Sequence, residues 1–184
     1  MQGIPLNERK RLGALLDDRP QTEVMAMIPQ FSQAETDNFV APPAQIPEAL
    51  GVLMFNMERG VNLPEIQEFL QDCPDIQPFD VILANELDDG CARSGNKNTA
   101  RELAQAFGLN YAWGLEFIEL VNDENAKGFH GNAVFSRWPI RRAGVIRLPE
   151  QYNWYFDRQK RIGGRLAVFA ELDVCLLYTS PSPR

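Results

Sequence analysis

The chain has 184 residues, of which 45% are hydrophobic and 23% are charged, as expected for one folded domain rather than a disordered chain. No stretch approaches the roughly 18 apolar residues that span a bilayer, and the first residues lack the apolar segment of a secretory signal, so we expect a cytoplasmic protein. The 3 cysteines lie far apart and predict neither a disulfide framework nor a zinc site.

The net charge of −7 is unevenly distributed along the chain. Residues 1–125 carry 8 basic and 21 acidic side chains, whereas residues 126–170 carry 9 basic and 2 acidic ones. A basic segment on an acidic chain suits a phosphate-bearing ligand better than non-specific binding along DNA. A solvated basic surface fits the same pattern equally well.

Residues 1–48 are predicted to form an N-terminal helix followed by a polar lead-in segment. The helix is expected over residues 7–17, with Asn7 as its N-cap. Residues 18–48 are polar and are interrupted by several prolines. They are expected to wrap a domain that begins at residue 49.

A strand, a helix and a second strand are predicted at the start of that domain. Residues 50–55 and 79–84 are apolar runs short enough for buried strands. Between them, Asn62 is suited to cap a helix whose apolar stripe begins at Ile66. This order and spacing indicate a parallel βαβ unit.

Further elements follow in the second half of the chain. Residues 99–102 form a capping box that opens a helix, and Gly108 is placed to end it. Strands are predicted over residues 111–121, 132–136 and 165–174. Together, these elements predict a mixed α+β fold.

Polar side chains follow both strands of the βαβ unit. Asn56 comes directly after the first strand and Glu86 after the second. The carboxyl ends of parallel strands emerge at the same edge of a sheet, where open α/β sheets bind ligands. Amide and carboxylate oxygens suit Mg²⁺ or Mn²⁺. Taken alone, the two residues are more typical of turns and surfaces than of a metal site.

The surrounding segments strengthen that interpretation. Residues 52–60, 80–86, 131–140 (Gly-Asn-Ala-Val-Phe-Ser-Arg-Trp-Pro-Ile) and 164–172 resemble, in order, successive motifs of the endonuclease/exonuclease/phosphatase superfamily. The resemblance implies part of a four-layer α/β/β/α sandwich, in which two packed mixed sheets are flanked by helices. Residues 49–174 would then be an incomplete domain of this type.

The resemblance also implies an activity. Glu86 would bind Mg²⁺ or Mn²⁺ with Asn56 beside it, and water would attack phosphorus in line. We therefore expect a metal-dependent phosphoesterase: a phosphodiesterase, nuclease or phosphatase. Its substrate would be nucleic acid, a phosphoinositide or another phosphodiester, and no partner protein is implied. The alternative is a non-catalytic member that only binds phosphate-bearing ligands.

The remaining candidates for substrate contact are Arg93, Glu116, His130, Asn132 and Arg165. Arg93 is either a phosphate ligand or a surface residue. The odd separation of Glu116 from Glu119 predicts opposite faces of a strand, with Glu116 toward the site. His130 is either structural or functional, whereas Asn132 is the stronger candidate in that segment. Arg165 rests on the resemblance and on its place at the start of a strand.

Two other charged groups are interpreted less specifically. Asp88 and Asp89 are expected to be turn residues rather than further metal ligands. Arg158, Lys160 and Arg161 face either the substrate or solvent.

Residues 175–184 depart abruptly from the family pattern. They look like a translated sequencing-adaptor end, so we expect a non-native tail on a truncated N-terminal half. The Thr-His-Leu, Asp-x-Asn and Ser-Asp-His motifs of the family, which supply its general base, do not follow. Truncation would leave apolar sheet faces and strand edges open to water. We therefore expect this chain alone to aggregate or be molten, and to be inactive.

Overall fold

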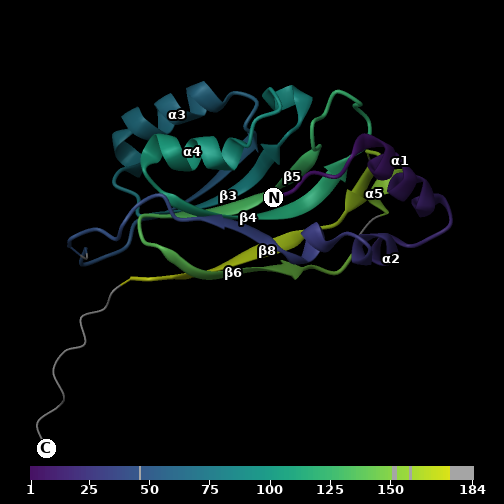
Figure 1. Ribbon diagram of the computed structural model, residues 1–184. Coiled ribbons are helices and arrows are strands. Elements are labelled where there is room, and N and C mark those ends of the chain that lie inside the picture. The colour runs from purple at the N-terminus through teal and green to yellow at the C-terminus, as the bar shows by residue number, and fades with distance from the viewer. Residues whose placement is uncertain (46, 151–152, 158, 175–184) are drawn as a thin grey trace, which may run out of the picture.

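The computed structural model describes residues 1–45, 47–150, 153–157 and 159–174. They form a mixed α+β fold in which helices cover one face of a 6-stranded sheet and a 2-stranded sheet packs against the other face (Figure 1). The α+β class predicted from the sequence is therefore confirmed.

The main sheet has the strand order β1-β4-β5-β3-β2, with β7 also paired to β4. Only the β2–β3 pair is parallel among the pairings that the structure describes, and the others are antiparallel. The strands are β1 (Ala34–Asp37), β2 (Val52–Arg59), β3 (Val81–Asp89), β4 (Asn110–Glu119), β5 (Phe129–Ser136) and β7 (Arg161–Gly163).

The predicted βαβ unit consists of β2, helix α3 (Leu63–Asp72) and β3. The predicted helix that follows is α4 (Thr99–Phe107), which ends at Gly108 with a φ of 59°. This left-handed conformation is one that glycine adopts at little cost. Both helices lie on the same face of the main sheet (Figure 1).

Two predicted helix starts are wrong by one or two residues. The helix α1 (Leu6–Ala14) has Pro5 rather than Asn7 at its N-cap position, and a 3₁₀ turn, η1 (Leu15–Asp17), continues it. In α4 the cap is Asn98, whose Oδ1 accepts a hydrogen bond from the Arg101 N–H at 2.9 Å. The Thr99 hydroxyl, expected to cap, instead donates to the backbone oxygen of Asp88 at 2.8 Å.

The N-terminal segment shares the core of the rest of the chain. Strand β1 pairs with β4 at one side of the main sheet. Leu12, Val24 and Phe31 are buried in the main hydrophobic cluster. Burial of each side chain stabilises the fold by roughly 1.5–3 kcal/mol. The segment before residue 49 and the rest of the described chain thus share one hydrophobic core. The segment also contains α2 (Gln21–Ala26) and the 3₁₀ helix η2 (Pro29–Ser32).

Strands β6 (Ile140–Arg147) and β8 (Leu166–Leu172) form the small antiparallel sheet. Strand β8 packs across β4 and β5 with the face predicted from its alternation. The sheets approach closely at Gly114, where an added Cβ would lie 3.0 Å from Val145 and 3.1 Å from Val168. Strand β6 was not predicted, because its charged start obscures the alternation. The other short elements are η3 (Pro74–Ile76), η4 (Ala92–Ser94) and α5 (Trp154–Asp157).

Apolar side chains remain exposed on β2, which forms an edge of the main sheet. Val52 is 58% exposed and Met54 is 72% exposed. An exposed apolar edge strand is a template for pairing with another chain. The expected tail, residues 175–184, lies outside the described residues.

We predict that Met54→Lys reduces self-association of the chain, because a charged side chain on an exposed edge opposes edge-to-edge pairing. The unfolding free energy should change by less than about 0.5 kcal/mol, since the side chain is mostly in solvent. Light scattering after gel filtration over a concentration series measures the effect. The control is Val121→Lys, which replaces a residue that is 66% exposed and lies outside the strands. Equal effects of the two variants would contradict a role for the β2 edge.

Candidate functional site

Strands β2 and β3 both become irregular in their carboxyl-terminal halves, which lie side by side at one end of the main sheet. Asn56 of β2 is in register with Asn85 of β3, and regular pairing is then interrupted. Glu86 lies in this interruption with a φ of 59°, a conformation that costs a non-glycine residue roughly 1 kcal/mol. Its N–H donates to Oδ1 of Asn132 on β5 at 3.1 Å. This bond holds the strained peptide in place.

A cavity of about 260 Å³ lies beside this end of the sheet. It brings together all the candidate residues except Arg93 and His130. The parallel pair thus delivers Asn56 and Glu86 to one space, as its topology predicts. The lining residues are Asn56, Asn85, Glu86, Glu116, Asn132, Leu148, Arg165 and Leu166.

Glu116 is a buried carboxylate with one oxygen bound and one oxygen open. Its Oε1 accepts a hydrogen bond from Nη1 of Arg165 at 2.9 Å. Its Oε2 has no hydrogen-bond partner among the described residues, and the closest cation-forming group is Nε2 of His130 at 3.9 Å. An unpaired oxygen of a buried carboxylate is costly unless a cation or donor reaches it.

The prediction that Glu116 and Glu119 face opposite sides of β4 is wrong. A bulge between Leu115 and Phe117 adds one residue to β4 opposite β5 and interrupts the period of two. Glu119 therefore contacts Arg161, and Glu116 contacts Arg165. Both arginines stack over the Phe117 ring. Both carboxylates belong to one connected group.

His130 lines a second cavity of about 390 Å³, which shares Glu86 and Arg165 with the first. The His130 Nδ1 lies 2.8 Å from Oδ1 of Asp88, its partner in the β3–β5 ladder. This contact fixes the imidazole ring and leaves Nε2 on the side of Glu116. The second cavity is lined by Arg59, Glu86, His130, Trp154, Gln159, Arg161 and Arg165.

Asp88 and Asp89 are both buried in strand β3 and are not the turn residues expected from the sequence. Arg93 donates to Asp88 through Nε at 2.7 Å and through Nη2 at 2.8 Å. Burial alone would raise the pKa of Asp88, but its hydrogen bonds to Arg93 and His130 outweigh this and lower that pKa. Asp88 is therefore held as a carboxylate.

The same ion pair determines the position of Arg93. Its Nη2 also lies 3.3 Å from Oε1 of Glu119, and Arg93 lines neither cavity. The guanidinium N–H groups of Arg93 bind the buried carboxylates of Asp88 and Glu119 rather than a ligand, because an unpaired buried carboxylate would cost several kcal/mol. The predicted contact of Arg93 with substrate has no support in this geometry.

Trp154 belongs to the site but was not singled out from the sequence, and Arg161 was predicted only as one member of a basic cluster. The Cζ of Arg161 lies 4.6 Å from the Phe117 ring centroid, and that of Arg165 lies 5.0 Å from the Trp154 centroid. Such cation–π contacts hold both guanidinium groups over the aromatic side chains. The basic composition of the segment was the only sequence signal for them.

The predicted basic cluster separates in the structure. Arg161 lines the second cavity, whereas Lys160 is exposed with its Nζ 5.3 Å from the Tyr155 ring centroid. Arg158 lies outside the described residues.

The first cavity offers oxygen ligands for a hard cation. Glu86 supplies a carboxylate, and Glu116 supplies its unpaired Oε2. The Oδ1 of Asn56 accepts from the Glu58 N–H at 2.8 Å and retains a second lone pair. In the described part of the chain, no group of 3 or more histidine, cysteine, aspartate or glutamate side chains is arranged to hold a metal. The set fits Mg²⁺, which is usually held by one or two carboxylates together with water and phosphate.

Comparisons with known proteins found no relative of this chain. A scan against models of protein families, a search of curated proteins and a search of solved structures each found no match. Within the described residues, no helix has the length and apolar character needed to cross a membrane.

We predict that Asp88→Asn destabilises the protein by about 3 kcal/mol or more, because it removes the charge that pairs with Arg93 and His130. Urea denaturation at neutral pH measures the loss. The control is Asp123→Asn, which removes an exposed ion pair to Lys10 and should cost at most about 1 kcal/mol. Similar losses in the two variants would show that the Asp88 network contributes little.

The same network predicts a pH dependence. Because the folded-state pKa of Asp88 is lowered, its contribution to stability is present above the ordinary aspartate pKa of about 3.9 and is lost as pH falls through the folded value. The stability difference between the wild type and Asp88→Asn should therefore shrink below about pH 4. Denaturation midpoints between pH 3 and pH 7 test this. A constant difference would contradict the assigned pairing.

Proposed function

We propose that this chain carries the metal and phosphate site of a metal-dependent phosphoester hydrolase. The observation that carries the proposal is the shared cavity of Asn56 and Glu86 at the carboxyl end of two parallel strands. The unpaired Oε2 of Glu116 supports it, since a buried carboxylate oxygen calls for a cation. Ligand sites at this edge are typical of parallel sheets.

Glu86 and Asn56 would hold Mg²⁺ or Mn²⁺, with Glu116 close enough in the same cavity to contribute its open oxygen. The bound ion would activate water for in-line attack and neutralise charge on the phosphate. The left-handed backbone at Glu86 supports this role, because strained residues cluster at ligand sites. The hydrogen bond that the Glu86 N–H donates to Oδ1 of Asn132 keeps Glu86 in that conformation.

Cationic and amide groups beside Glu86 would bind the phosphate oxygens. Arg165 donates to Glu116 only through Nη1 among the described contacts, so its other N–H groups are available to a phosphate. The Oδ1 of Asn132 is occupied by Glu86, and its amide NH₂ is therefore the group offered to a ligand. His130, oriented by Asp88, presents Nε2 to the adjoining cavity.

The proposed architecture is the four-layer α/β/β/α sandwich. The helix layer, the main sheet and the β6–β8 sheet would be three of those layers. The reaction class covers phosphodiesterases, nucleases and phosphatases, and a cytoplasmic location accompanies the proposal. The alternative function is that of a phosphate-binding protein of the same fold that does not cleave its ligand.

We predict that the chain binds Mn²⁺ and that Glu86→Gln weakens this binding tenfold or more, because a neutral amide replaces the principal anionic ligand. Calorimetric titration with MnCl₂ measures the affinity. Glu58→Gln is the matched control, since Glu58 is an exposed carboxylate of the same strand edge and lines neither cavity. Equal affinity in the two variants, or no Mn²⁺ binding by the wild type, would refute the metal site.

A second measurement separates hydrolysis from binding alone. The product of the complete gene should hydrolyse bis(p-nitrophenyl) phosphate with Mg²⁺ or Mn²⁺, and Glu86→Gln should abolish the activity. Metal and phosphate binding without hydrolysis would favour the alternative function.

A further inference from the structure

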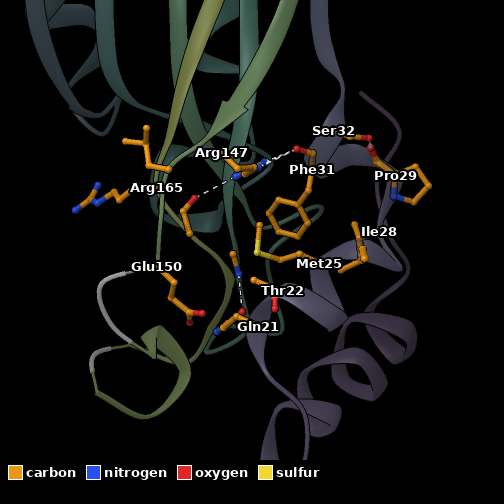
Figure 2. Close-up of a pocket in the computed structure, with 14 residues that line it drawn as sticks. Gln21, Thr22, Met25, Ile28, Pro29, Phe31, Ser32, Arg147, Glu150 and Arg165 are labelled. Carbon is orange, nitrogen blue, oxygen red and sulfur yellow. Dashed lines mark hydrogen bonds between the residues drawn. The ribbon is translucent and has the colours of Figure 1, made fainter.

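A separate, mostly apolar cavity of about 310 Å³ lies between the N-terminal segment and the end of β6 (Figure 2). The segment from helix α2 to the 3₁₀ helix η2 supplies Met25, Ile28 and Phe31 to one side of it. Leu148, Gly163 and Gly164 also line it. Its volume is at the small end of the range for ligand cavities, so it suits one chemical group rather than a whole large ligand.

Most polar side chains around this cavity are already bonded to the protein. Gln21 donates to the Arg161 carbonyl oxygen at 3.1 Å and accepts from the Gly163 N–H at 3.0 Å. The half-buried guanidinium of Arg147 donates to backbone oxygens, among them that of Phe31 at 2.6 Å. A nucleobase or sugar entering here would lose water contacts without gaining equivalent hydrogen bonds. The cavity therefore favours a hydrocarbon group.

The apolar cavity adjoins the Asn56–Glu86 cavity. Leu148 and Arg165 line both of them. In Figure 2 the guanidinium of Arg165 extends away from the apolar side chains, and it donates to Glu116 in the other cavity. Arg165 thus forms a boundary, with its guanidinium on the polar side. Glu150 lines the apolar side, where its negative charge disfavours a phosphate.

We propose that the α2–β6 cavity binds the hydrocarbon group of a phosphoester whose phosphate lies in the Asn56–Glu86 cavity. The inference rests on the proposed function, because it assigns the phosphate to that site. It narrows the substrate class to phosphoesters with an alkyl or aryl substituent and disfavours polynucleotides. The adjacency of the two cavities, which share Leu148 and Arg165 in their linings, carries the assignment.

Non-hydrolysable alkylphosphonates test the proposal by calorimetric titration in the presence of Mg²⁺. Methyl-, butyl-, hexyl- and octylphosphonate form the series, and phenylbutylphosphonate tests an aryl group. Affinity should rise up to about fourfold for each methylene that enters the cavity, and then level off when it is full. An affinity independent of chain length would overturn the proposal.

A filling variant tests the location. Ala26 is an exposed residue of α2 that lines the cavity, so Ala26→Trp should occupy it without removing a core side chain. We expect the chain-length dependence to disappear, with octylphosphonate falling to the affinity of methylphosphonate. Met27→Trp is the matched control, because Met27 is exposed next to Ala26 and does not line the cavity. It should retain the wild-type series. Loss of the dependence in both variants, or in neither, would overturn the location.

The Glu86→Gln variant distinguishes failure of this inference from failure of the proposed function. If Glu86→Gln weakens methylphosphonate binding but chain length has no effect, the phosphate site stands and the hydrocarbon site is wrong. If affinity rises with chain length in the wild type and Glu86→Gln changes nothing, the apolar cavity binds hydrocarbon independently and its link to the phosphate site is wrong.

Discussion

The buried carboxylate of Asp88 is the constraint on which the arrangement of the candidate site depends. A buried charge without partners would cost several kcal/mol, so donors must converge on it from separate elements. Arg93 reaches it from the loop after β3, and His130 reaches it from β5. Its backbone oxygen also accepts the Thr99 hydroxyl at the start of α4. One carboxylate therefore ties the helix layer to the sheet and orients the only histidine of the chain.

Two strand irregularities shape the proposed ligand site on this rigid support. The interruption of the β2–β3 pairing places Glu86 in a left-handed conformation beside Asn56, and the bulge of β4 turns Glu116 toward the same space. Bulges are common beside active sites because they redirect one side chain without moving the sheet. The open oxygen of Glu116 and the guanidinium of Arg165 then offer opposite charges to one ligand.

Regular patterns in the sequence predicted the regular parts of the structure. Apolar runs and helix signals located β2, α3, β3 and α4, and parallel pairing predicted that Asn56 and Glu86 would share an edge. Alternation failed between Glu116 and Glu119, because a bulge breaks the period of two and leaves no local signal. The roles of Asp88 and Arg93 also escaped prediction, since an aspartate pair after a strand is more typical of a turn than of a buried ion pair.

The N-terminal segment illustrates why polar composition alone is a poor guide to function. Its prolines and polar residues predicted only a wrapping lead-in, yet Gln21 hydrogen-bonds β7 at both Arg161 and Gly163. It thereby holds the strand whose arginine stacks over Phe117 beside Arg165. The next turns of the same segment supply Met25 and Phe31 to the apolar cavity. Residues outside the motif-bearing region thus position a cation of the polar site and form a wall of the hydrocarbon site, so substrate selection would depend on this segment.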